Sequence, residues 1–162
     1  MGRGYKKTCK KCGFSFSCYE GAGFLFPRIY KETVEKSLSG ELGKDIKGFL
    51  EVHPDGAIDV ETVALCCEKC GNLKSGKNLA MYLPKINNPT KRNDTQWSVA
   101  FPAPADKYVM RSDLNQYYEK FADYPHICEK CNGKMRIVKS NETLMCPKCN
   151  EPLEISEEFN WD

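Results

Sequence analysis

Apolar side chains recur at helical spacing in one stretch of the chain, residues 27–53. They are loosely spaced among Lys and Glu residues in the first part of the stretch, and in the second part, residues 42–52, they lie on one helical face. The apolar positions are Ile29, Val34, Leu38 and Leu42 in the first part, and Ile46, Phe49 and Leu50 in the second. Gly40 divides the stretch, and the turn sequence HPDG at 53–56 ends it. The pattern predicts a helical segment in two parts.

Alternation of apolar and polar residues predicts short strands on both sides of two cysteine pairs. Residues 57–65 alternate up to one pair, and residues 78–83 form a predicted strand after it. Nearer the C-terminus, residues 134–139 and 143–145 predict the two strands of a hairpin. The sequence PLEI that follows, at 152–155, predicts a further strand.

The middle of the chain has a weaker pattern. Residues 84–96 are polar and contain prolines, which is typical of a linker, and residues 97–101 predict a short strand. Ser112 is a suitable N-cap for a helix that runs to about residue 122. These segments connect two cysteine-rich regions.

The chain contains ten cysteines among 162 residues, and their spacing indicates metal binding. Eight of them form four C-x-x-C pairs, each with Lys before the second cysteine and Gly or Asn directly after it. Gly and Asn enter the left-handed backbone region most easily, as the tight turn of a metal-binding knuckle requires. The eight predicted ligands are Cys9, Cys12, Cys67, Cys70, Cys128, Cys131, Cys146 and Cys149.

Cys18 and Cys66 do not fit this pattern. Cys18 has no partner at knuckle spacing, and Cys66 directly precedes a complete pair. Adjacent residues of a strand point to opposite faces, so Cys66 is expected to point away from a metal bound by Cys67. Both cysteines are predicted to be small buried side chains.

Three kinds of chemistry compete for the four pairs. Disulfides need an oxidising compartment, and residues 1–11 are basic with no apolar run after them, so we expect no signal peptide and a cytoplasmic protein. No apolar run approaches the ~20 residues of a membrane span. A thioredoxin-like motif needs one pair that opens a helix. Two tetrahedral four-thiolate sites fit best, and we expect zinc rather than iron in each.

Sequence distance predicts how the pairs combine. Only the segment 132–145 separates Cys131 from Cys146, which leaves room for the predicted hairpin. The pairs at 128/131 and 146/149 are therefore expected to form one site, and those at 9/12 and 67/70 the other, across the long segment 13–66. Interlaced sites would need two long loop closures, whose entropic cost grows slowly with length.

The C-terminal pairs and their predicted hairpin resemble the zinc-ribbon, or rubredoxin-like, fold over about residues 124–160. The two cysteine-rich regions together, with the stretch at 12–27, resemble bacterial proteins with two zinc ribbons, and this resemblance brings no activity with it. It implies an α+β fold of two small zinc-ribbon β units. Residues 1–83 would form the first ribbon, with the helical insertion at about 27–53. A linker and short strand at 84–111 and a connecting helix at 112–123 would lead to the second ribbon, residues 124–162.

The expected function is a structural-zinc protein that acts as a nucleic-acid or protein interaction module. Four thiolates leave no open position for catalysis, and only His53 and His126 are present as histidines, so an enzyme is not favoured. Iron-based electron transfer of the rubredoxin type is an alternative. Basic and aromatic residues that would contact phosphates and bases are Arg3, Tyr5, Lys6, Lys7, Lys10, Lys11, Phe14, Phe16, Lys91, Arg92 and Trp97.

Total charge argues against a strongly basic nucleic-acid binder. The formal net charge is +2 with neutral thiols; eight thiolates add −8 and two divalent cations add +4, so the loaded chain has a charge of −2. Any contact with a polyanion must therefore come from a local basic patch.

Overall fold

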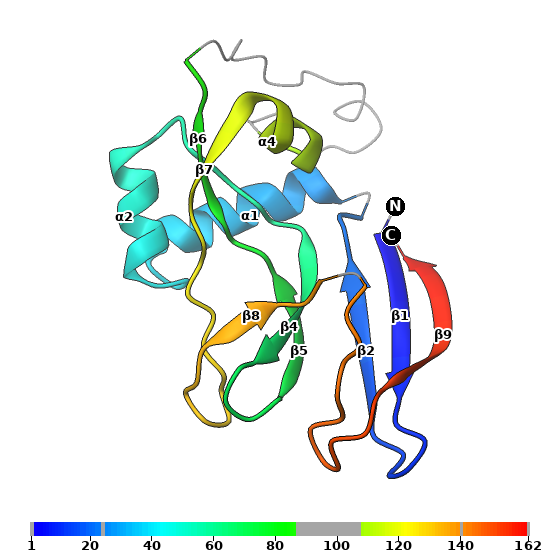
Figure 1. Ribbon diagram of the computed structural model, residues 1–162. Coiled ribbons are helices and arrows are strands. Elements are labelled where there is room, and N and C mark those ends of the chain that lie inside the picture. Colours follow the sequence, from blue (N-terminus) through cyan, green and yellow to red (C-terminus); the bar gives the residue numbers. More distant parts are fainter. Residues whose placement is uncertain (1, 24, 87–107, 140, 162) are drawn as a thin grey trace. The chain divides into compact units, whose positions relative to one another are not determined.

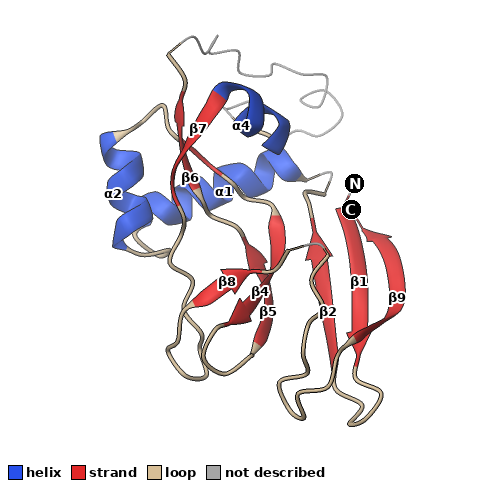
Figure 2. Ribbon diagram, in the orientation of Figure 1, coloured by secondary structure: helices blue, strands red, loops and turns tan. Residues whose placement is uncertain are grey.

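The computed structural model describes residues 2–23, 25–86, 108–139 and 141–161, which combine helices with small antiparallel sheets (Figures 1 and 2). Within these residues there are three helices and three sheets of three strands each. The α+β class predicted from the sequence is confirmed. The chain divides into two compact units, each assembled from separate stretches of sequence.

The first unit comprises Met1–Gly23, Thr62–Asn78 and Pro125–Asp162, and we call it the cysteine unit. The second comprises Phe24–Glu61 and Leu79–Tyr124, and we call it the helical unit. All ten cysteines belong to the first unit.

The helical unit begins with the two helices that the apolar spacing predicts. Helix α1 spans Phe26–Ser39 and helix α2 spans Lys44–Val52. Pro27 stands in the first turn of α1, where its missing N–H leaves no hydrogen bond unmade. Gly40 ends α1 in the left-handed conformation, with φ of 88°, and its N–H donates to the last turn. The predicted two-part helical segment is confirmed.

A small sheet accompanies these helices in the order β3-β6-β7. Its strands are β3 (Ala57–Ile58), β6 (Met81–Pro84) and β7 (Tyr118–Ala122), and the short helix α4 (Arg111–Tyr117) directly precedes β7. The apolar positions of α2, Ile46, Phe49 and Leu50, are buried. The buried residues of α2 therefore lie on its predicted apolar face, whereas α1 buries Phe26, Tyr30, Thr33 and Ser37 and leaves the predicted position Leu38 exposed.

The cysteine unit contains two sheets of the same topology. The first has the order β2-β1-β9, with β1 (Gly2–Thr8), β2 (Ser15–Glu20) and β9 (Glu154–Trp161). The second has the order β5-β4-β8, with β4 (Thr62–Cys67), β5 (Leu73–Lys77) and β8 (Met135–Ile137). In each, a hairpin turns at a C-x-x-C pair, and a third strand pairs antiparallel with the first.

The two sheets define two modules, one nested in the other along the chain. The outer module consists of residues 2–23 and 141–161, near the two ends of the sequence. The inner module consists of residues 62–78 and 125–139. The two parts of the helical unit follow the first segment of each module in the sequence.

One apolar core joins the two modules. The outer module contributes Phe16, Cys18, Leu144 and Leu153, and the inner module contributes Ala64 and Val138. Along β2, Phe16 and Cys18 are buried and the residue between them is exposed, as strand alternation requires. The modules therefore share buried surface that neither would have alone.

The face of the outer sheet that points away from this shared core carries three aromatic rings. Tyr19 makes edge-to-face contacts with Phe159 and Trp161, at centroid distances of 5.5 and 5.8 Å. The rings of Phe159 and Trp161 lie directly over Gly4 and Gly2, where any Cβ would overlap them. The near-terminal tryptophan is thus packed on the sheet, and its indole N–H donates to the carbonyl of Arg3 at 3.3 Å.

Within the described residues, β8 does not pair with residues 143–145, so the hairpin predicted at 134–145 is not observed. Strand β8 instead pairs with β4, at Leu65↔Ile137 and Cys67↔Met135. Of the residues at 152–155, the last two belong to β9, which pairs with β1, and Pro152 forms an isolated antiparallel bridge with Met145. Local alternation predicted the strand at 134–139 but could not identify its partner, since pairing depends on distant parts of the chain.

Two boundaries also differ from the predictions. The strand expected at 57–65 is divided into β3 and β4, which belong to different sheets. The helix expected from Ser112 to about 122 begins at Arg111 and ends at Tyr117, where β7 begins. Its N-terminal side-chain acceptor is Asp113, which accepts a hydrogen bond from the N–H of Met110 at 3.0 Å. Tertiary pairing with β6 outweighs the helical propensity of residues 118–122.

The predicted strand at 97–101 and most of the linker at 84–111 lie outside the described residues. Among the helices that the structure describes, none is long and apolar enough to cross a membrane.

Replacement of Ile46 by Ala tests the core of the helical unit. Ile46 is fully buried, so we expect Ile46→Ala to lower the free energy of unfolding by about 2–5 kcal/mol. Val52, at the end of the same helix, is 70% exposed, and Val52→Ala should change it by less than about 0.5 kcal/mol. Urea denaturation followed by circular dichroism measures both. Equal effects would place Ile46 outside the core.

Candidate metal centres

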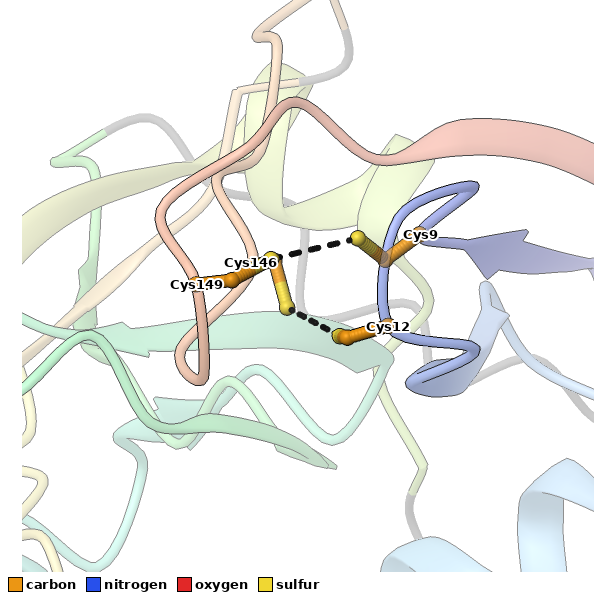
Figure 3. Close-up of side chains that lie close together, drawn as sticks. All are labelled: Cys9, Cys12, Cys146 and Cys149. Atoms are coloured by element: carbon orange, nitrogen blue, oxygen red, sulfur yellow. Dashed lines mark hydrogen bonds between the residues drawn. The ribbon is translucent and has the colours of Figure 1, made fainter.

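The structure brings the eight predicted cysteines into two groups of four. One group consists of Cys9, Cys12, Cys146 and Cys149, and the other of Cys67, Cys70, Cys128 and Cys131. Within each group all sulfur atoms lie within 4.8 Å of one another. Each group combines the knuckle at the hairpin of its module with the knuckle before the third strand, and the side chains of the outer group point toward one another from two loops (Figure 3).

The predicted combination of pairs is therefore wrong. Cys9 and Cys12 meet the pair at 146/149, across the whole segment 13–145, and not the pair at 67/70. Closing the longer loops costs only about 2 kcal/mol more than the predicted combination, because loop entropy grows with the logarithm of length. The backbone pairing of β1 with β9 and the shared apolar core outweigh that cost.

The sulfur positions suit a tetrahedral site. The closest cross-knuckle sulfur distances are 3.4 Å for Cys9–Cys149 and 3.5 Å for Cys12–Cys146, the contacts dashed in Figure 3. In the inner group they are 3.5 Å for Cys67–Cys131 and 3.7 Å for Cys70–Cys128. Four sulfurs bound at about 2.3 Å to a central cation would lie about 3.8 Å apart, whereas a disulfide needs about 2.0 Å. The two groups can each hold one metal ion.

All four knuckles have the same backbone hydrogen bonds. The residue after the second cysteine donates its N–H to the carbonyl of the first cysteine, at 2.8–3.0 Å. The N–H of the first cysteine donates to the carbonyl five residues later, at 2.7–2.9 Å. The residues after the second cysteine have positive φ, from 55° to 73°: Gly13, Gly71, Asn132 and Asn150. The Gly or Asn seen at this position in the sequence is thus explained by backbone conformation.

This turn directs amide groups at the first sulfur of each pair. The N–H groups of Cys12 and Lys11 lower the pKa of Cys9 to about 7, although burial opposes them. Burial would raise the pKa of Cys128, but the amides of Lys130 and Cys131 and the thiols of Cys70 and Cys67 lower it to about 6. The knuckles therefore favour thiolates, the form that binds a metal.

Without a cation, one thiol in each group resists ionisation. The N–H of Gly133 lowers the pKa of Cys131, yet its three neighbouring thiols and burial raise it to about 12. Cys149 behaves in the same way in the outer group, where the N–H of Glu151 is outweighed and the pKa rises to about 12. Four adjacent thiolates repel one another, so a bound cation is what would allow all four to ionise.

Cys18 and Cys66 lie outside both groups. Cys18 is fully buried, and Cys66 packs partly buried against the core that joins the modules, on the face of β4 opposite Cys67. Burial raises the pKa of both thiols, which keeps them protonated. Their predicted role as small core side chains agrees with these positions.

The two histidines also lie outside the groups. His53 contacts the rings of Phe49 and Phe121, and the ring nitrogen Nε2 of His126 lies 2.8 Å from the carbonyl oxygen of Asn78. Burial lowers the pKa of His126, so its ring is mainly neutral at pH 7.

Most of the basic and aromatic residues predicted to meet a nucleic acid are engaged within the outer module. Arg3 pairs with Glu158, Lys10 with Glu154 and Lys11 with Glu151. Lys7 and Phe16 are buried, and Tyr5 and Phe14 pack against the core. Lys91, Arg92 and Trp97 lie outside the described residues.

These ion pairs also identify a signal that the sequence contained. Basic residues concentrate at 3–11 and acidic residues at 151–158, and the strands in these stretches, β1 and β9, are neighbours. Opposite charges on facing strands stabilise their pairing modestly. Matching the two runs would have pointed to the observed combination of cysteine pairs.

Comparison of the chain with protein-family models, with curated proteins and with solved structures gave no match. The two groups of four cysteines are compatible with sites of the zinc-ribbon type, but no family is identified. The geometry of the sites is therefore the basis on which a function can be assigned.

The combination of knuckles can be tested with protein reconstituted with a spin-active cadmium isotope. We expect one cadmium signal to couple with the β-protons of Cys9, Cys12, Cys146 and Cys149, and the other with those of the inner group. Heteronuclear NMR detects these couplings directly. A cadmium ion that couples with both Cys12 and Cys67 would contradict the nested arrangement.

Serine substitutions separate ligands from core cysteines. Cys128→Ser removes a ligand and should empty the inner site, because binding free energy at such sites is of order 10 kcal/mol and is shared with folding. Cys18→Ser and Cys66→Ser should leave the metal content unchanged, since both thiols lie outside the groups. Elemental analysis of the purified variants gives the result. Loss of metal in Cys66→Ser with retention in Cys67→Ser would reverse the assignment.

Proposed function

We propose that the chain is a structural zinc protein whose two modules are zinc ribbons, each closed by one zinc ion. The ligands are Cys9, Cys12, Cys146 and Cys149 in the outer ribbon, and Cys67, Cys70, Cys128 and Cys131 in the inner ribbon. The observation that carries this proposal is the convergence of two identical knuckles on each site at tetrahedral spacing. Bound zinc would supply charge neutralisation and a crosslink between distant segments.

A structural role is supported by the donor set. Four sulfur ligands fill a tetrahedral coordination shell, so no position is left for water or substrate. Neither histidine belongs to a group, and no carboxylate of the described residues does. Catalysis at these centres is therefore not favoured.

The size of the modules supports the same role. The two modules form one small unit around a shared core, and chains below about 70–80 residues commonly need a metal or disulfides to fold stably. The sulfur distances of 3.4–3.7 Å are those of a metal site, not of disulfides. Thiols that bind a metal must stay reduced, which supports the cytoplasm as the place of action.

The protein would then act as an interaction module, because closed four-thiolate sites rigidify short loops and present their side chains in fixed positions. Both nucleic acids and proteins are recognised by such surfaces. The alternative is iron in one or both sites with a role in electron transfer, since four sulfurs suit either metal.

Protein purified without added metal should contain about two zinc ions per chain, one for each group. Elemental analysis measures zinc and iron together, and absorption spectra distinguish a colourless zinc protein from a red ferric one. Two iron atoms per chain would favour the electron-transfer alternative. A metal content near zero would overturn the proposal.

Removal of the metal should unfold the cysteine unit. A strong chelator at neutral pH is expected to remove the strand signals of the two modules, because the binding free energy of structural zinc is largely folding free energy. The indole N–H of Trp161, hydrogen-bonded to Arg3, is a local reporter in NMR spectra. An unchanged Trp161 signal in the metal-free protein would show that the outer module folds without zinc.

A further inference from the structure

The four knuckles carry the same lysine, one position before the second cysteine, in different surroundings. In the outer module Lys11 forms an ion pair with Glu151 at 3.0 Å. Lys148 lies over the ring of Phe14, with its Nζ 5.8 Å from the ring centroid. Both outer lysines are thus engaged by their own module.

The inner knuckle lysines have no such partners. Lys69 and Lys130 are exposed, and neither takes part in an ion pair or a ring contact within the described residues. The same holds for the exposed side chain of Lys134, which follows the second inner knuckle. The inner module therefore presents three cations that its own structure leaves to solvent.

These three lysines come from adjoining segments of backbone. A Cβ at Gly133 would lie 2.9 Å from the Cβ of Lys69 and 3.1 Å from the sulfurs of Cys67 and Cys131. Lys134 follows Gly133, and its carbonyl accepts a hydrogen bond from the N–H of Glu68 at 3.0 Å. Lys69 and Lys130 each directly precede the second cysteine of an inner knuckle, so all three lysines belong to the backbone beside the inner group of cysteines, and we call them the inner lysine cluster: Lys69, Lys130 and Lys134.

The net charge of the inner module is also more positive than that of the outer module. The inner module carries seven basic residues: Lys69, Lys74, Lys77, Lys130, Lys134, Arg136 and Lys139. Its acidic residues are Glu68 and Glu129, and Glu129 is held by Lys74. The seven cations contribute +7, the two carboxylates −2, and the four thiolates with a divalent cation −2, so the net charge of the loaded inner module is +3.

The outer module balances six basic residues against six glutamates, so its loaded site leaves it at −2. A polyanion would be attracted to the inner module and repelled by the outer one. The basic N-terminal residues, which the sequence pattern favoured, belong to the module that repels it.

We propose that the inner lysine cluster binds the phosphate backbone of a nucleic acid, an inference that rests on the proposed zinc-ribbon function. Lysine is depleted at protein–protein interfaces, whereas phosphate contacts are made largely by lysine and arginine. The inner module, residues 62–78 and 125–139, contains no Phe, Tyr or Trp on which a base could stack. Recognition here is therefore of the phosphates and is independent of base sequence.

The chain offers a matched control for this proposal. The test variant is Lys69→Gln, Lys130→Gln and Lys134→Gln together, and the control is Lys10→Gln, Lys11→Gln and Lys148→Gln together. Each removes three positive charges from knuckle residues or their neighbours, one set on each module. Both variants are first required to keep the metal content and circular dichroism of the parent, which tests the proposed function separately from its partner.

Binding is measured on the zinc-loaded full chain by fluorescence anisotropy, with labelled single-stranded and duplex DNA and RNA of about 20 nucleotides, from about 25 to about 200 mM salt. We expect the inner variant to bind at least about tenfold more weakly at low salt. Its slope of log K against log salt on a duplex should fall by up to about 2.7, since each phosphate contact contributes about 0.9. The control should stay within about twofold of the parent.

Three results would overturn the proposal. Equal losses in both variants would mean that net charge alone attracts the polyanion. Absence of binding at the lowest salt, with two zinc ions still bound, would refute the partner and leave the zinc-ribbon function standing. Competition by polyglutamate as strong as that by an equal concentration of phosphate charges would point instead to an acidic protein surface.

Discussion

Each group of four thiols must join two knuckles that lie far apart in the sequence, and the cysteine unit is organised around this requirement. The outer group links residues near the two ends of the chain, and the inner group links two segments within that loop. Strand pairing achieves both closures in the same way, by adding a third strand to the free side of a hairpin. The knuckles then meet at the end of each sheet, where their sulfurs approach within 4.8 Å.

Nesting explains how the helical unit can be divided in the sequence without disrupting the knuckles. Its two parts follow the first segment of each module, so they lengthen the loops between knuckles and leave each knuckle intact. Loop entropy rises only with the logarithm of length, so a long insertion is tolerated where strands and core hold the ends. The shared core, from Phe16 to Leu153, also couples the two modules. Loss of one site should therefore weaken the packing around the other.

The same knuckle lysine has different neighbours in the two modules. In the outer module Lys11 pairs with Glu151 and Lys148 lies over the ring of Phe14, whereas the knuckle lysines of the inner module have no such neighbours among the described residues. Exposed ion pairs contribute little stability, of order 0–1 kcal/mol each. They nevertheless change which face of the protein attracts an anion, because paired charges cancel at a distance. The proposed partner surface would thus be set by the neighbours of the knuckles, not by their own sequence.

Local patterns along the chain were enough to identify the chemistry and much of the secondary structure. The C-x-x-C spacing with Gly or Asn after it identified all eight grouped cysteines and excluded Cys18 and Cys66, because the knuckle turn is a local backbone requirement. The apolar spacing likewise predicted α1 and α2. Only the folded chain shows which knuckles meet and which strand pairs with β8. It also shows that α4 ends where β7 begins. These pairings depend on contacts between segments as distant as the two ends of the sequence. The alternation of apolar residues along a strand shows which face is buried, but it does not identify the segment that packs against that face.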